Sequence, residues 1–251
     1  MRQNVRRPLT VSVLLLAVPA ALAVLPSAGA ASAPWQVRAA WHFDSISAGQ
    51  VADASGHGRA LRLAGNWSAV SGSTGTGAAR FSLQSYGTVG GAGPRALRQE
   101  VAVTAVLRSQ VRRPTGDHPN VLQHGHYTDR SQIKMQITKD GTGRASCRFA
   151  GSRAHGVVTG PGIDVSDGGW HSVTCWRRGA TLGITVDGVQ RTRQRDVGSI
   201  DPTRALTLAA RGLAAGAASD QFAGDLDAVV WAIGDGARKA APQYAAQLVR
   251  R

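Results

Sequence analysis

Hydrophobic and polar residues alternate in short runs along most of the chain. Residues 101–109 read VAVTAVLRS and residues 224–233 read GDLDAVVWAI, with Gly, Asp, Asn and Ser clusters between such runs. Alternation with a period of two residues is typical of β-strands. Strands are therefore predicted at residues 39–43, 61–65, 78–82, 101–109, 120–125, 131–138, 144–150, 169–177, 182–188, 205–210 and 224–233.

The spacing of these runs predicts one all-β domain, a two-sheet antiparallel sandwich or jelly roll. A parallel sheet would need helical crossovers between its strands, and the sequence leaves no room for them. The expected domain spans residues 41–236, after a short linker at 31–40. In the tail at 237–251, the segment APQYAAQLVRR can form a short helix.

The first thirty residues have the pattern of a secretory signal peptide. Three arginines precede the apolar run LTVSVLLLAVPAALAVL, and small residues follow it, with cleavage expected after Ala30. A membrane anchor is the alternative, but the run is short and is interrupted by Pro19. The sequence therefore predicts a secreted, extracellular protein with no membrane span after cleavage.

The chain is strongly basic. Removing the three signal arginines lowers the formal charge from +14 to +11, and nearly all of the excess is arginine. A basic surface favours anionic partners such as acidic glycans, cell-wall polymers or nucleic acid. The arginines are scattered, so we expect no specific nucleic-acid binding, and a bias towards arginine codons is the favoured explanation of the charge.

The two cysteines are Cys147 and Cys175. An even pair in an oxidising compartment indicates a disulfide. A catalytic thiol or a zinc site is a weaker alternative, because an exported thiol tends to oxidise and structural zinc needs four ligands.

The stretch DGGWHSVTCWRRGATLGITVDG, residues 167–188, predicts a β-hairpin. Val173 and Cys175 would lie on one face of its first strand, and Trp170 and Trp176 on the other.

The same stretch closely resembles a hairpin of laminin-G-like, concanavalin A-like jelly-roll domains. Residues 41–66, with WHFD and DASGHG, are similar to the opening of that family, and FAGDLDAVVWAIG at 222–234 is similar to its closing strand. The resemblance implies the jelly-roll fold and a pairing of Cys147 with Cys175. It also implies a structural calcium ion held by Asp53 and Asp227, because such loops supply the hard oxygens that calcium prefers. The family includes lectins, glycosidases, lyases and adhesion modules, so the fold leaves the function open.

Catalysis by paired glutamates is excluded, because the chain has a single glutamate, Glu100. The sharpest catalytic hypothesis is a polysaccharide lyase built from a cluster of polar residues in the segment HGHYTDRSQIKMQI. Its candidate residues are His124, His126, Tyr127, Gln132 and Lys134. The resemblance weakens this hypothesis, because such lyases carry Gln-Ile-His where this chain has Gln-Ile-Lys. No Gly-x-Ser-x-Gly elbow is present either. We therefore predict no enzyme.

The sequence favours a secreted, non-catalytic binding module for a carbohydrate or cell-surface glycan. The candidate ligand contacts are Trp67, Tyr127, Trp176 and Arg177, because aromatic side chains stack on sugar rings and arginine suits an anionic ligand. Trp41, Trp170 and Trp231 are expected in the core. The alternatives are a lyase or glycoside hydrolase with a divergent active site, or a structural adhesion protein of the cell surface.

Overall fold

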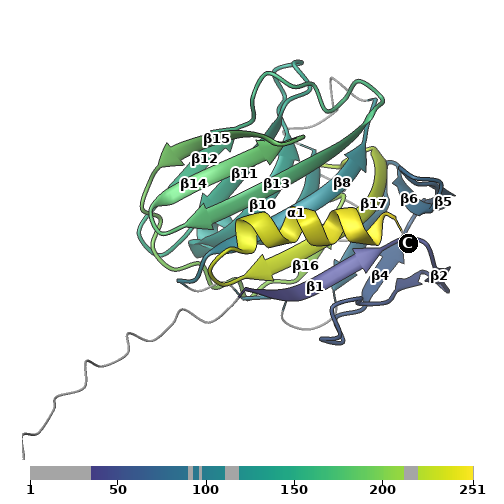
Figure 1. The fold of residues 1–251 in the computed structure, drawn as a ribbon, viewed down its shortest axis with the longest axis horizontal. Helices are drawn as coiled ribbons and strands as arrows, with labels where there is room; N and C mark the ends of the chain where they lie inside the picture. The colour runs from purple at the N-terminus through teal and green to yellow at the C-terminus, as the bar shows by residue number, and fades with distance from the viewer. Residues whose placement is uncertain (1–34, 90–92, 96–97, 111–118, 212–219, 251) are drawn as a thin grey trace, which may run out of the picture. The chain divides into compact units, whose positions relative to one another are not determined.

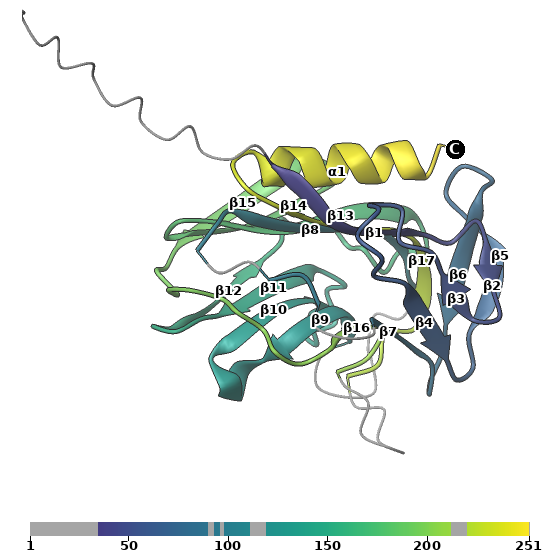
Figure 2. The same ribbon diagram turned by 90° about the horizontal axis from the view of Figure 1, so that it is seen from below.

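The alternating segments pair into two antiparallel sheets that lie face to face (Figure 1, Figure 2). The computed structural model describes residues 35–89, 93–95, 98–110, 119–211 and 220–250. Within these residues the chain is the two-sheet antiparallel jelly-roll sandwich that the strand pattern predicts. The predicted signal peptide lies outside the described residues.

One sheet has eight strands and the other has nine. The eight-stranded sheet has the order β15 (Val189–Gln194), β14 (Thr181–Val186), β13 (Trp170–Arg178), β8 (Val101–Arg108), β17 (Gly224–Ile233), β6 (Gly77–Phe81) and β5 (Ser68–Ser71), and β1 (Gln36–His42) also pairs with β17. The nine-stranded sheet has the order β12 (His155–Thr159), β11 (Ala145–Ala150), β10 (Ser131–Ile137), β9 (Asn120–His126), β16 (Leu206–Leu208), β7 (Tyr86–Val89), β4 (Leu61–Ala64), β3 (Gln50–Val51) and β2 (Ile46–Ser47). All the strands predicted from apolar alternation are present, with ends that shift by three residues at most.

The domain begins earlier than the sequence predicts. β1 starts at Gln36, whose backbone aligns with Ile233 of β17, so half of the expected linker at 31–40 is a strand. At the other end, the expected short helix is present as α1 (Ala237–Leu248). It packs on the outer face of the eight-stranded sheet, so it belongs to the domain and is no separate tail (Figure 2).

The main core lies between the two sheets. Each inner strand alternates as predicted: in β13, Val173 and Cys175 join this core, while Trp176 joins a second cluster under α1. Trp41 and Trp231 are fully buried between the sheets, as expected for core tryptophans. Trp170 is half-buried and packs at the margin of the second cluster.

The disulfide between Cys147 and Cys175 is present, with their Cα atoms 5.5 Å apart. Cys147 lies in β11 of the nine-stranded sheet and Cys175 in β13 of the eight-stranded sheet. The bond therefore crosses the core and ties the two sheets to each other.

The side of the sandwich where β15 and β12 lie is closed by arginines. Arg191, Arg193 and Arg195, alternate residues in and just after β15, donate hydrogen bonds to carbonyl oxygens in and beside β12 of the other sheet. Each of these donor–acceptor distances is 3.3–3.4 Å. The contacts cap the open edges of both sheets, so part of the arginine excess is structural.

Candidate functional site

The outer face of the nine-stranded sheet is polar. In β10, Ile133, Met135 and Ile137 point into the core, so the alternate residues Gln132 and Lys134 point outward, together with Gln136. No described α-helix lies over this side, in contrast to the eight-stranded sheet (Figure 2). We call this outer surface the polar face.

Strand register aligns polar side chains in a row across the polar face. Six strands contribute neighbouring residues at one level of the sheet: Arg148 of β11, Lys134 of β10, Gln123 of β9, Thr207 of β16, Thr88 of β7 and Arg62 of β4. Neighbouring side chains at one level of a sheet lie about 5 Å apart. The row is therefore a continuous strip of hydrogen-bonding groups, which only the pairing of distant segments creates.

The strip has a positive centre. Lys134 is almost completely buried, and its Nζ lies 3.4 Å from Oδ2 of Asp220. Burial lowers the pKa of Lys134, and the neighbouring Arg148 and Arg211 lower it further, while Asp220 opposes the decrease. One carboxylate thus faces three cationic groups, so the centre of the face suits an electron-rich or anionic ligand.

Several buried polar atoms of the polar face have no hydrogen-bond partner in the described structure. They include Oε1 of Gln132, Nε of Arg148, Oγ of Ser146 and Oδ1 of Asn120. Buried polar atoms are nearly always paired, and an unpaired one costs about 1–3 kcal/mol. Four such atoms near one surface therefore indicate a place where water or a ligand with many hydroxyl groups supplies the missing partners.

Tyr127 lies at the end of this face. It begins the 3₁₀ helix η1 (Tyr127–Asp129) that connects β9 to β10, and 52% of its surface is exposed. The guanidinium carbon of Arg148 lies 5.0 Å from the centre of the Tyr127 ring, and the His126 ring lies 4.7 Å away. An ion pair between Asp129 and Arg204 holds the turn. The phenol ring is thus an exposed, positioned aromatic surface beside the strip.

One of the five candidate lyase residues is separated from the others. Gln132 and Lys134 lie on the polar face, and Tyr127 lies at its end beside His126. His124 points into the core, where its ring contacts Trp231 at 5.4 Å. Burial lowers the pKa of His124 to about 4. A histidine sealed between two sheets has no access to a polymer substrate, so it cannot transfer a proton to one.

Two predicted ligand contacts require correction. Trp176 is only 4% exposed, because α1 covers it and Arg238 of that helix lies over its ring at 5.4 Å. Arg177 is only 2% exposed and donates hydrogen bonds to the backbone oxygens of Gln99 and Gly198. Both side chains are largely buried, and Arg177 lies in the lining of a cavity with Arg153 and Asp196. Trp67 is partly buried against the main core.

Asp53 and Asp227 lie in separate hydrogen-bond networks, and the calcium ion that they are expected to hold stays a prediction. Both oxygens of Asp53 accept backbone N–H bonds, from Ala40 and two residues of its own loop, at 2.9–3.0 Å. Asp227 instead accepts hydrogen bonds from Ser73. The backbone N–H of Phe43 bonds to Asp227, and Phe43 lies three residues beyond Ala40.

Among the described residues, no group of three or more His, Cys, Asp and Glu side chains is arranged to hold a metal ion. Asp227 lies in β17, and its carboxylate accepts hydrogen bonds from Ser73 in the loop after β5. Burial raises its pKa, which Ser73 opposes, and its Oδ1 makes no hydrogen bond in the described structure.

The strip across the polar face could not be found from sequence alone. Gln123, Arg148 and Thr207 lie in separate strands, and no short motif joins them. The one available signal was alternation in β10, where SQIKMQI places polar residues opposite a buried face.

None of the helices in the described part of the chain has the length and apolar character needed to cross a membrane. No curated protein sequence matches the chain. Residues 117–231 match the family model of the Laminin G domain. These residues include most of the strands that carry the polar strip.

Solved structures with the same fold cover most of the chain. Domain 4 of AbnA, an extracellular GH43 arabinanase of Geobacillus stearothermophilus solved with arabinotriose, is 15% identical, with a TM-score of 0.60 over 86% of this chain and 98% of that one. Botulinum neurotoxin type C, in a structure concerning ganglioside interaction, is 11% identical, with a TM-score of 0.56 over 85% of this chain and 51% of that one. The binding domain of botulinum neurotoxin DC, solved with rat synaptotagmin II, is 11% identical, with a TM-score of 0.55 over 85% of this chain and 52% of that one. The chain thus spans about half the length of the toxin chains. Residues 117–231 thus resemble a Laminin G domain, and the solved structures share the jelly-roll fold of this chain.

Proposed function

We propose that this protein is a secreted, non-catalytic module that binds carbohydrate on the polar face beside Tyr127. The observation that carries the proposal is the strip of outward amide, hydroxyl and cationic groups with unpaired buried atoms among them. Sugar hydroxyls both donate and accept hydrogen bonds, so they can bond to the partly or fully exposed members of the strip, Arg148, Thr88 and Arg62. The exposed ring of Tyr127 offers the flat apolar surface on which a pyranose stacks.

The similar structures support the same class of ligand. Domain 4 of AbnA was solved with arabinotriose, and the neurotoxin structures concern gangliosides and a sialylated ligand. Their low identity gives no reason to transfer a particular sugar. A binding role also agrees with His124, whose place in the core removes a proton donor from the surface.

The N-terminal segment supports export. Its basic start, apolar run and small residues have the order of a cleaved signal peptide. Mass spectrometry of the protein from culture medium should give a mature chain that begins at Ala31, and an intact N-terminus in that fraction would contradict export with cleavage.

The function can be tested by a binding screen against neutral and acidic polysaccharides, followed by calorimetry with the best ligand. Tyr127→Ala should weaken binding at least about 10-fold, because a central aromatic contact commonly contributes about 2 kcal/mol. Gln132→Ala should weaken it to a lesser extent. Trp35→Ala is the matched control, because Trp35 is also an exposed aromatic residue (45%) but lies beside the first turn of α1.

Three results would contradict the proposal. Equal losses for Tyr127→Ala and Trp35→Ala would place the ligand elsewhere. Binding that disappears in high salt while neither variant matters would reduce the interaction to net charge. The appearance of unsaturated or newly reducing ends during the assay would show catalysis. A chelator tests the predicted calcium ion, because loss of binding on chelation would place a metal at the binding site.

A further inference from the structure

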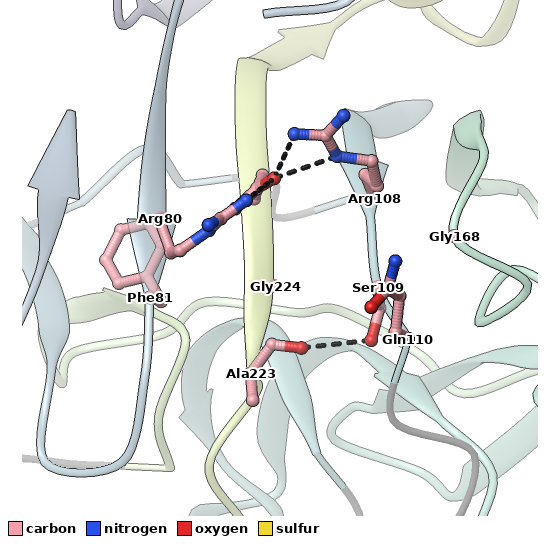
Figure 3. A pocket seen from close by; sticks show the side chains of 9 residues that line it. Arg80, Phe81, Arg108, Ser109, Gln110, Gly168, Ala223 and Gly224 are labelled. Atoms are coloured by element: carbon pink, nitrogen blue, oxygen red, sulfur yellow. Dashed lines mark hydrogen bonds and ion pairs between the residues drawn. The ribbon is translucent and has the colours of Figure 1, made fainter. Parts of the chain in front are cut away.

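A second row of side chains crosses the outer face of the eight-stranded sheet, at the end of β8 and the beginning of β17. Register places Trp170 of β13 beside Arg108 of β8, Arg108 beside Asp225 of β17, and Asp225 beside Arg80 of β6. The carboxylate of Asp225 is nearly buried between the two guanidinium groups (Figure 3). This row is separate from the polar face, which belongs to the other sheet.

Asp225 holds both arginines in place. Arg80 donates from Nε and Nη2 at 2.7 and 3.1 Å, and Arg108 donates from Nε and Nη2 at 2.8 and 2.6 Å. Burial alone would raise the pKa of Asp225, but the hydrogen bonds from Arg80 and Arg108 outweigh it and lower the pKa. Asp225 is therefore ionised, and Arg108 is fixed further by its position 4.7 Å over the Trp170 ring.

The three charges do not cancel. Two guanidinium groups share one carboxylate, which leaves one net positive charge at the row. Each guanidinium has about five N–H donors and uses only two nitrogens on Asp225. The remaining donors are fixed in direction by the bonds that are already made, which is the preorganisation that oxyanion recognition requires.

The row borders a cavity of about 400 Å³. Its lining includes Arg80, Arg108, Gln110, Gly168 and Gly224, and Asp225 is the only acidic residue among the lining residues that the structure describes. The two glycines keep the space open. A side chain on Gly168 would place its Cβ 3.2 Å from the amide nitrogen of Gln110, and one on Gly224 would collide with the backbone oxygen of Arg108 at 2.4 Å.

Figure 3 shows Arg80 on one side of this region and Arg108 and Gln110 together on the other, and all three line the cavity. We propose that the cavity binds the carboxylate or sulfate group of an acidic sugar. The unused guanidinium N–H groups would bind the anion, and the side-chain amide of Gln110 would bind a hydroxyl group of the same sugar unit. A cavity of this volume is of the size that small-molecule ligands occupy.

The charge arrangement makes a prediction that a purely structural ion-pair network does not make. Arg80→Gln removes donors and positive charge, so it should weaken anion binding. Asp225→Asn removes the competing carboxylate and leaves both guanidinium groups, so it should strengthen anion binding. The two changes disrupt the same ion pairs but have opposite effects on an anionic ligand.

The experiment is calorimetric titration of the oxidised protein with sulfate, glucuronate and glucose at constant ionic strength. We expect sulfate, glucuronate or both to bind and glucose to bind at least 10-fold more weakly at this cavity. Arg80→Gln should weaken anion binding at least 10-fold, and Asp225→Asn should strengthen it several-fold. Arg144→Gln is the matched control: it removes one arginine from an ion pair with Asp140 between β10 and β11 of the other sheet, it does not line the cavity, and it lowers the net charge equally.

Each outcome decides the proposal. Binding of sulfate alone identifies a sulfated sugar, and binding of glucuronate alone identifies a uronic acid. Absence of binding to both anions, or equal losses for Arg80→Gln and Arg144→Gln, would overturn the proposal. If Asp225→Asn does not fold, Arg80→Gln still decides, because the Arg80 side chain is about half exposed (53%). Tyr127→Ala should leave anion binding unchanged, so failure here and failure of the polar-face proposal are distinguishable.

Discussion

The two sheets are built from strands of the same kind, but their outer faces have different neighbours. On the eight-stranded sheet, Ala102, Ala228 and Val230 pack against the alanine-rich side of α1, including Ala241 and Ala245. Small side chains on both partners allow the helix to approach the sheet closely. On the nine-stranded sheet, amide and cationic side chains point outward with no α-helix over them in the described structure.

The difference separates stability from function. Burial of apolar area under α1 stabilises the fold by roughly 25 cal/mol for each Å². Unpaired polar atoms on the polar face, such as Oε1 of Gln132, work in the opposite direction. A protein commonly retains such unfavourable groups where they bind a ligand. The comparison can be tested by changing each face and measuring both stability and binding.

The largest effect is expected under the helix. Trp176→Ala should lower the free energy of unfolding by about 3–5 kcal/mol, because the ring is buried between α1 and the sheet. Denaturant unfolding measures it. Tyr127→Ala is the control on the other sheet and should change stability by less than about 0.5 kcal/mol, since its ring is exposed. Similar losses in both variants would remove the contrast between the faces.

The bond that joins the two sheets comes next. Replacing Cys147 and Cys175 with serine should lower stability by about 3–4 kcal/mol, from the greater freedom of the unfolded chain. The change is measured by denaturant unfolding of the variant against the oxidised protein. Reducing agent should lower the stability of the wild type and leave that of the variant unchanged. An effect of reducing agent on both would show that the loss does not arise from this bond.

The two sheets also differ in how a histidine responds to pH. His124 has a folded pKa of about 4, whereas the unfolded chain binds the proton near 6.5. Stability should therefore fall as pH decreases from about 6.5 to about 4, by about 3 kcal/mol in total, and should not fall further from this cause. His124→Leu should lose this part of the pH dependence in unfolding measurements made at each pH.

His171, at the start of β13 in the eight-stranded sheet, provides the opposite case. Burial lowers its pKa, but hydrogen bonds to Asp187 at 2.7 Å and Asp167 at 2.9 Å outweigh burial and raise it. Its stabilising effect is complete below pH of about 6.5 and is lost as pH rises through the raised value. His171→Gln should therefore lower the free energy of unfolding mainly at acidic pH. An equal decrease at all pH values would contradict the role of the two aspartates.

The smallest effect is expected on the polar face. Gln132→Leu keeps the side chain's size and removes a buried amide oxygen that has no partner in the described structure. Stability should stay constant or rise by about 1 kcal/mol, while glycan binding falls. Thermal unfolding and calorimetry on the same samples test both parts. A clear loss of stability would show that Gln132 is held by an interaction that supports the fold.

Strands with apolar alternation were predictable because burial of one face determines every second residue. β15 was not predictable, because all six of its residues are exposed. Its arginines donate hydrogen bonds to backbone oxygens in and beside β12. β7 was not predictable either, because its glycine and threonine resemble the loop that follows them. The cysteine pair was correctly predicted from the number of cysteines and the expected compartment.

Tertiary structure decided which polar and aromatic residues are accessible. Trp176 and Arg177 lie beside a turn in the sequence, which favours exposure. The C-terminal helix covers Trp176, however, and Arg177 donates a hydrogen bond to the backbone oxygen of Gly198. His124 and Lys134 looked like neighbours, yet β9 directs one inward and β10 directs the other outward.

The sequence by itself determined the fold class, the strands with one buried face and the disulfide, because each depends on local periodicity or on residue number. The rows Arg148–Lys134–Gln123–Thr207 and Arg108–Asp225–Arg80 depended on tertiary structure. Their members come from strands far apart in the chain, and only long-range pairing and its register place them at one level of a sheet. A shift of a single residue in that register would turn each of these side chains to the other face.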